Sequence, residues 1–392
     1  MQYSCFHVRT ELSLSLQVKG LVLTKIFFSD AWAVPASSVI DSLGVAHRSG
    51  MQSGDLFNAF RCWAASNIIA YCSGYPLHVL LQSPLMSQLK HYRLQFLVVL
   101  VEPFESLMAH LRGKSDSPVD WGEIQSANPS GNSPSETLKW SYWCWSAVQL
   151  SYYFGKLEIG YKLLAPYARL SAIDVAYFST SICVFFSGLT CSGLAKKTGK
   201  RKYVKEARRA TDKMKFIMRN RGLNNLHRYL LMQAELLALT SKKRHQNVKM
   251  AYDKAIATAG KAGFVQDAAL ANELAFEYFR SIGDEYWAGH YIVRACELYH
   301  EWGASAKVGI LKNEHSSYLN DSRNFSVLAS RTADNSDSHM ISSTRNWFSG
   351  EGSTRIVKSI DLDSLSFART SATDMTKNLS ATVGDLRGRQ PQ

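Results

Sequence analysis

The sequence predicts an all-α protein built from a series of helix hairpins. Residues 266–281 and 285–302 each repeat apolar side chains every three or four positions, the period of a helix that buries one face. Ile282, Gly283 and Asp284 separate the two stretches, and glycine tolerates the left-handed conformation with which many helices end. One hairpin cannot bury its own apolar face, so we expect several to stack into a solenoid with a continuous core.

Small residues indicate the kind of hairpin. Ala288 and Ala295 follow Gly283 by five and twelve residues, and this spacing is the skeleton of a tetratricopeptide-like repeat. Ala255 holds the matching position 40 residues before Ala295. Because a standard repeat of this kind has about 34 residues, the units are predicted to be elongated or degenerate.

Further helices are predicted along the chain. Apolar helical stretches occur at 59–71, 142–153, 227–239 and 251–256, and Gly74 and Gly155 lie in the turns after the first two. We therefore expect degenerate N-terminal helical repeats over 1–112 and C-terminal tetratricopeptide-like repeats over 138–312.

Two segments lack the helical period. Residues 113–137 are rich in Gly, Pro, Ser and Asn and predict a flexible loop. Residues 313–392 are rich in Ser and Thr and poor in aromatic side chains, which predicts a mostly disordered tail. Within that tail, 356–367 is the exception and reads as a short helix or docking segment.

Composition narrows the class of protein. Hydrophobic residues make up 46% of the chain and charged residues 20%, a normal balance for a globular protein. The seven cysteines are odd in number and form no CxxC pair, so we expect buried thiols rather than disulfides or metal ligands. No apolar run approaches the 18 residues of a membrane helix, and residues 1–30 lack the pattern of a signal peptide. Together these features predict a cytoplasmic protein.

The strongest local signal is a cluster of positive charge. Residues 196–254 contain eighteen Lys or Arg and four Asp or Glu, a charge of +14 against +13 for the whole chain. The predicted contact surface consists of Lys197, Lys200, Arg201, Lys202, Lys205, Arg208, Arg209 and Lys213. Such a surface would suit nucleic-acid phosphates, anionic lipid or an acidic protein. A solvated outer face of a repeat helix is the plainer interpretation, and the lack of any nucleic-acid-binding motif argues against nucleic acid.

Other candidate sites give way to structural interpretations. Residues 188–201 (GLTCSGLAKKTGKR) resemble a phosphate-binding loop. However, five residues rather than four separate Gly193 from Gly199, and Arg201 replaces the Ser or Thr of the motif. The aromatic side chains of 140–154 are at helical spacing and favour a core position over a recognition groove. No pair of histidines has metal-ligand spacing, and His290 is expected at the surface. We therefore predict no catalytic residue, no cofactor and no metal site.

Several segments resemble one family. Residues 264–275, 288–299 and 302–308 resemble the helical-repeat region of large multidomain signalling kinases, of the multi-sensor or hybrid histidine kinase type. In that family a kinase-like domain and an AAA-type ATPase domain precede the repeats, and a GAF sensor domain with a histidine kinase or cyclase often follows. The resemblance covers about residues 20–312, and 360–365 looks like the entry to the sensor. No position of this chain matches the family's catalytic motifs.

These observations predict a non-catalytic scaffold or connector for protein–protein interaction in a signal-transduction protein. The resemblance implies a place between an ATPase module and a sensor-kinase output, with neighbouring domains or separate proteins as partners. The apolar stretch 18–28 suits a chain whose preceding repeats are missing, since a terminal repeat normally has a polar outer face. Two alternatives remain: a fragment of an ATP-dependent histidine or Ser/Thr kinase, and a basic nucleic-acid or anionic-membrane binder.

Overall fold

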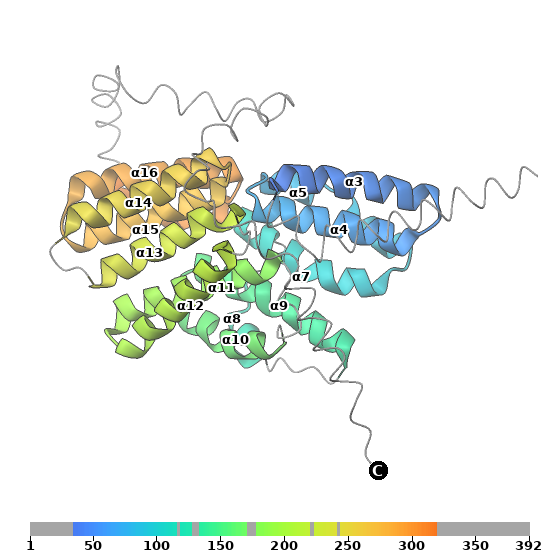
Figure 1. The fold of residues 1–392 in the computed structure, drawn as a ribbon, viewed down its shortest axis with the longest axis horizontal. Helices are drawn as coiled ribbons and strands as arrows, with labels where there is room; N and C mark the ends of the chain where they lie inside the picture. The colour runs from blue at the N-terminus through green and yellow to red at the C-terminus, as the bar shows by residue number, and fades with distance from the viewer. Residues whose placement is uncertain are drawn as a thin grey trace, which may run out of the picture. The chain divides into compact units, whose positions relative to one another are not determined.

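The computed structural model describes residues 34–115, 118–127, 133–170, 178–219, 223–240 and 244–319, all of which belong to one compact unit. Every regular element in these ranges is helical, which confirms the all-α prediction (Figure 1). The tail beyond residue 319, with the segment 356–367, lies outside the described residues, as do residues 1–33.

The helices are listed here in chain order. They are α3 (Ala36–Gln52), α4 (Leu56–Cys72), α5 (Leu77–Leu81), α6 (Leu85–His91), α7 (Gln95–Arg112), α8 (Trp121–Ser126), α9 (Pro134–Tyr153), α10 (Leu157–Leu170), α11 (Phe178–Thr198), α12 (Arg201–Arg219), α13 (Leu226–Thr240), α14 (His245–Lys261), α15 (Val265–Ser281), α16 (Glu285–Trp302) and α17 (Ser305–Glu314).

Consecutive helices form hairpins. The most extensive helix–helix packing joins α3 to α4, α9 to α10, α11 to α12, α13 to α14 and α15 to α16. Smaller interfaces join neighbouring hairpins: α12 packs against α13, and α14 packs against α15. Ten of the described helices therefore form five pairs, and the last three pairs, from α11 to α16, pack one against the next (Figure 1).

The hairpin predicted most firmly from sequence is present. Helices α15 and α16 begin and end within one residue of the predicted bounds. Gly283 has a positive φ of 76° in the turn, and the Asp284 side chain caps α16 by accepting the Trp287 N–H at 3.2 Å. Ala288 and Ala295 are fully buried, as expected where helices approach closely.

The predicted loop over 113–137 is wrong in part. It contains the short helix α8, and α9 already begins at Pro134. Both starts have side-chain caps: Asp120 accepts the Glu123 N–H at 2.9 Å, and Ser133 accepts the Glu136 N–H at 3.2 Å. Ser133, Pro134 and Glu136 follow the capping-box pattern with proline at the first helical position, a local signal that the Gly, Pro and Ser content concealed. At the other predicted boundary, Asn313 and Glu314 still belong to α17.

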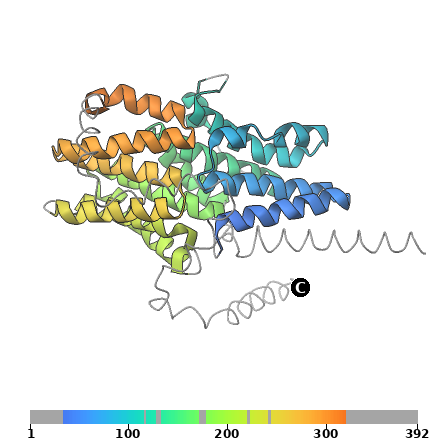
Figure 2. The same ribbon diagram turned by 90° about the horizontal axis from the view of Figure 1, so that it is seen from above.

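The main hydrophobic core runs through helices from both halves of the described chain. Trp302, at the end of α16, lies with its ring 5.8 Å from Tyr71 of α4 and 5.8 Å from Tyr153 of α9. Helix α17 packs against α7, so the last described helices contact much earlier ones (Figure 2). These long-range contacts add to the nearest-neighbour packing of the hairpins.

Gly74 and Gly283 both have a left-handed backbone, but a Cβ atom would meet a steric conflict only at Gly74. Gly74 and Gly283 have φ values of 86° and 76°, which are unfavourable for any residue with a Cβ atom. A Cβ on Gly74 would collide with the Gln266 Oε1 atom and lie 2.9 Å from the Val265 backbone nitrogen, whereas a Cβ on Gly283 would meet open space.

We expect Gly74→Ala to lower the free energy of unfolding more than Gly283→Ala does. The left-handed backbone costs each variant about 1–2 kcal/mol, and only Gly74→Ala adds the collision. Urea midpoints of the two variants and the parent protein measure the difference. Equal midpoints for the two variants would show that α15 does not approach the end of α4 as closely as described.

Candidate functional site

The predicted basic surface lies on α12, on the turn before it and, with Lys197, on the last turn of α11. All eight predicted residues, from Lys197 to Lys213, are exposed. The opposite side of the helix buries Ala207, Thr211 and Met214 against α11 and α13. Apolar residues at this spacing fix the rotation of the helix, and the cations are thereby turned outward.

Five of these cations form what we call the basic face: Arg201, Lys205, Arg208, Arg209 and Lys213. Within the part of the chain that the structure describes, none of the five takes part in an ion pair. The helix also carries two carboxylates. Glu206 accepts a hydrogen bond from the Tyr161 hydroxyl of α10 at 3.2 Å, and Asp212 is exposed. The basic face therefore keeps most of its positive charge at the surface.

Of the three remaining predicted residues, Lys197 and Lys202 have local side-chain contacts. Lys197 forms an ion pair with Glu158 at 2.5 Å, and both side chains are more than half exposed. The Lys202 ammonium lies over the ring of Tyr203, 4.5 Å from its centroid, and 5.6 Å from that of Tyr161. The Lys197 pair joins the end of α11 to α10, and the Lys202 contact joins the start of α12 to α10. Lys200 and the five residues of the basic face form no ion pair within the described residues.

Two other sequence candidates are placed as structural elements. Residues 188–198 of the rejected phosphate loop, including Gly193, are part of helix α11, so their backbone N–H groups are not arranged in a loop around an anion. Gly199 follows the helix in a turn, with a φ of 67°. In the aromatic segment, Trp145 and Tyr153 are buried and the other rings are half-buried. This placement agrees with the core interpretation.

An ionic cluster that the sequence reasoning missed lies in the core. The Arg228 guanidinium and the His227 Nε2 atom both contact the Asp267 carboxylate at 2.7 Å, and the three side chains are almost completely buried. Arg228 also donates to the Asn225 side-chain oxygen at 3.1 Å. The His227 ring stacks on Phe264, with 4.3 Å between centroids. Buried charges are stable only when paired in this way.

The cluster also receives the end of another helix. The carbonyl of Cys72, the last residue of α4, accepts hydrogen bonds from Arg228 at 2.8 Å and from the Gln266 amide at 2.7 Å. The last carbonyls of a helix have no partner within it and carry partial negative charge, so a guanidinium is a fitting donor. Helices α4, α13 and α15 are thus held together at one point.

The pKa values in this cluster follow from burial and charge. Burial lowers the pKa of His227, and the effect outweighs the hydrogen bond to Asp267. Burial alone would raise the pKa of Asp267, but the Arg228 guanidinium and the hydrogen bond from His227 bring it below its usual value. Neutral His227 therefore donates its Nε2–H to an ionised Asp267 carboxylate.

A second polar cluster joins α17 to α9 and α15. The Lys307 ammonium is buried; it contacts the Glu273 carboxylate at 2.6 Å and donates to the Tyr153 carbonyl at 2.9 Å. The Tyr299 hydroxyl donates to the same carboxylate at 2.7 Å. Both clusters join residues far apart in the chain, so no local spacing announces them. The one available signal was a charged residue inside an apolar stretch, such as Arg228 within 226–232.

The cysteine thiols of the described residues are buried in the core. Six cysteines are buried and unpaired, and Cys5 lies outside the described residues. Burial raises the pKa of Cys62, Cys72 and Cys144 to about 12, so these thiols stay protonated. In the described ranges, no three His, Cys, Asp or Glu side chains come together as metal ligands. His290 is exposed on α16, as expected.

Comparisons with known proteins give no relative. No family model matches the chain, and no curated protein or solved structure matches it significantly. Among the described helices, none combines the length and apolar character needed to cross a membrane.

We expect Asp267→Asn to destabilise the fold strongly. The change keeps the shape of the side chain but leaves the buried Arg228 without its counter-ion, a loss of about 3–5 kcal/mol in the free energy of unfolding. Glu297→Gln is the matched control, because Glu297 pairs with Arg294 at 2.8 Å at the surface and such a pair contributes less than about 1 kcal/mol. Similar urea midpoints for the two variants would contradict a structural role for the buried pair.

Stability should also fall on acidification because of His227. Its pKa is lowered in the folded protein, so the unfolded chain binds a proton first as pH falls below the ordinary histidine value of about 6.5. The folded state loses stability from that pH downward until His227 itself protonates. His227→Gln can still donate to Asp267 but does not titrate, so its unfolding midpoint should change less between pH 7.5 and pH 5.5. His315, whose pKa burial also lowers, remains in both proteins. Parallel pH profiles would refute the assignment.

Proposed function

We propose that this chain is a non-catalytic, tetratricopeptide-like scaffold that binds an acidic protein surface through the basic face of α12. The observation that carries the proposal is the set of five exposed cations without ionic partners in the described residues. They lie on one helix, whose other side is packed in the core.

The succession of helix hairpins supports the scaffold part of the proposal. Stacked hairpins present rigid helical faces, and such faces commonly receive a peptide or a neighbouring domain. The 20-residue steps from Gly263 to Gly283 and from Gly283 to Gly303, each with a positive φ, support a repeat period of about 40 residues. The resemblance of this same region to the repeats of signalling kinases supports a connector role between an ATPase module and a sensor output.

Charge supports the nature of the partner. A row of like charges on a rigid helix attracts an oppositely charged surface and sets the speed and specificity of the encounter. Rigid spacing along a helix suits a folded or helical acidic partner. Nucleic acid and anionic membrane share the negative charge and form the second candidate class, which the following experiment separates from the first.

The test measures binding of three probes by fluorescence anisotropy or co-sedimentation at two salt concentrations. The probes are a Glu-rich helical peptide, a single-stranded RNA and phosphatidylserine vesicles. We expect the peptide to bind, and its affinity to fall about tenfold in the variant Arg201→Gln, Lys205→Gln, Arg208→Gln and Arg209→Gln, since each exposed ion pair contributes about 0.3–0.5 kcal/mol. Higher salt should also weaken binding of the peptide to the parent protein, because salt screens exposed charges.

The control variant removes the same charge elsewhere. It carries glutamine in place of four other exposed lysines, Lys90, Lys139, Lys254 and Lys261. This variant should bind the peptide like the parent protein. Equal loss in both variants would show a non-specific effect of net charge. Tighter binding of RNA or vesicles than of the peptide would favour the second class, and absence of binding to all three probes would reject the basic face as a contact surface.

A further inference from the structure

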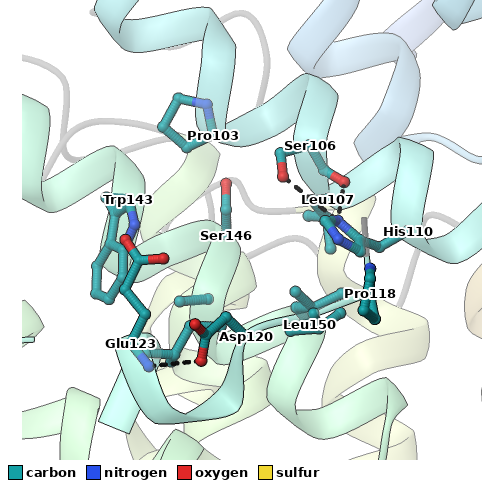
Figure 3. A pocket seen from close by; sticks show the side chains of 13 residues that line it. Pro103, Ser106, Leu107, His110, Pro118, Asp120, Glu123, Trp143, Ser146 and Leu150 are labelled. Atoms are coloured by element: carbon teal, nitrogen blue, oxygen red, sulfur yellow. Dashed lines mark hydrogen bonds between the residues drawn. The ribbon is translucent and has the colours of Figure 1, made fainter. Parts of the chain in front are cut away.

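A pocket of about 280 Å³ lies between α7, α8 and α9 (Figure 3). Its apolar wall includes Pro103, Leu107, Ile124 and the Trp143 indole. Small-molecule sites generally have volumes of about 300–1,000 Å³. This pocket is slightly smaller, which suits a single side chain or a short ligand.

A buried hydroxyl group at the pocket lacks a hydrogen-bond partner among the described residues. Ser146 of α9 is 5% exposed, and among the described residues its Oγ atom has no hydrogen-bond partner. Figure 3 shows this hydroxyl directed into the space near Pro103 and Trp143. A buried polar atom without a partner costs free energy, and most such atoms in folded proteins are satisfied. A ligand with a hydrogen-bond donor would satisfy it.

A histidine adds a second acceptor to the same pocket. The His110 Nδ1 atom lies 2.7 Å from the Ser106 carbonyl oxygen, and because a carbonyl only accepts, Nδ1 carries the hydrogen. In the neutral ring the other nitrogen, Nε2, is then an acceptor. Within the described residues no partner contacts Nε2.

Two carboxylates give the pocket its charge. Asp120 and Glu123 line it, and no Lys or Arg does so among the described residues. Asp120 Oδ1 accepts the Glu123 N–H, which leaves the second Asp120 oxygen and the Glu123 carboxylate for a ligand. In the part of the chain that is described, neither carboxylate forms an ion pair. The pocket lining is therefore acidic, although the chain as a whole has a net charge of +13.

We propose that this pocket binds the ammonium end of an elongated alkyl amine. The ammonium donates to the Ser146 hydroxyl and to the carboxylates, and the alkyl stem lies along the apolar wall. The Trp143 indole adds attraction for a cation near its face. The amine is either a free alkylamine or the side chain of a lysine in a peptide. This inference is independent of the basic face and of its partner.

The test follows the indole N–H signal of Trp143 by NMR during titration of the full chain. The chain has nine tryptophans, so its indole region holds few signals, and Trp143→Phe assigns the one of interest. The probes are n-hexylammonium, the uncharged 1-hexanol and a capped Gly-Lys-Gly peptide. We expect a saturable shift with n-hexylammonium and a much smaller one with 1-hexanol. A response to the peptide as well identifies a lysine side chain as an accepted ligand, and its absence restricts the site to free amines.

Two variants and one control locate the binding. Glu123→Gln should weaken n-hexylammonium binding about three- to fivefold, as expected for an exposed ion pair. Ser146→Ala should weaken it at least about tenfold, because a hydrogen bond to a charged group is lost. Ser146→Ala should unfold at the same or a higher urea concentration than the parent protein without ligand, since it removes an unsatisfied hydroxyl.

Glu285→Gln is the control, because Glu285 is also an exposed carboxylate in the first turn of a helix capped by aspartate. It should bind n-hexylammonium like the parent protein. Equal shifts with 1-hexanol and n-hexylammonium would overturn the proposal in favour of a simple apolar cavity. Binding unchanged by both pocket variants, or no saturable shift with any probe, would also overturn it.

Discussion

The buried pair of Arg228 and Asp267 is the interaction on which the arrangement of the described helices depends. The pair joins α13 to α15, and the same guanidinium holds the final carbonyl of α4. Apolar packing tolerates small rotations and slides, but a buried charge does not tolerate the loss of its counter-ion. The geometry of this one side chain therefore sets how the N-terminal helices approach the C-terminal hairpins.

The other buried polar contacts follow the same logic. Lys307 fixes α17 to the end of α9, and the Tyr71 hydroxyl donates to the Gln149 side chain to fix α4 to α9. Each contact requires one partner at one distance, so it selects a single packing from the many that a core of leucine, alanine and aromatic side chains permits. Surface charge is organised differently: the basic face on α12 has no such partner in the described residues.

Local features were predictable from the sequence, and long-range ones were not. The hairpin of α15 and α16 was predicted because helix period, turn glycine and cap all lie within 40 residues. The basic face was predicted for the same reason, since charge and apolar stripe share one helix. The meeting of Cys72 with Arg228 and Gln266 depends on how hairpins stack, which no local pattern encodes. Ser146 likewise reads as an ordinary helical serine until α7 and α8 enclose it.

The position of Trp302 between Tyr71 and Tyr153 delays the completion of this part of the core until late in synthesis. At about 5–20 residues per second, roughly 7–30 seconds pass between the synthesis of Tyr153 and that of Trp302. During that interval the aromatic side chains of α4 and α9 lack the ring that covers them in the finished core. A nascent chain of this kind presents apolar surface suited to chaperone binding. Its N-terminal helices reach their final packing only when the last hairpin has been made.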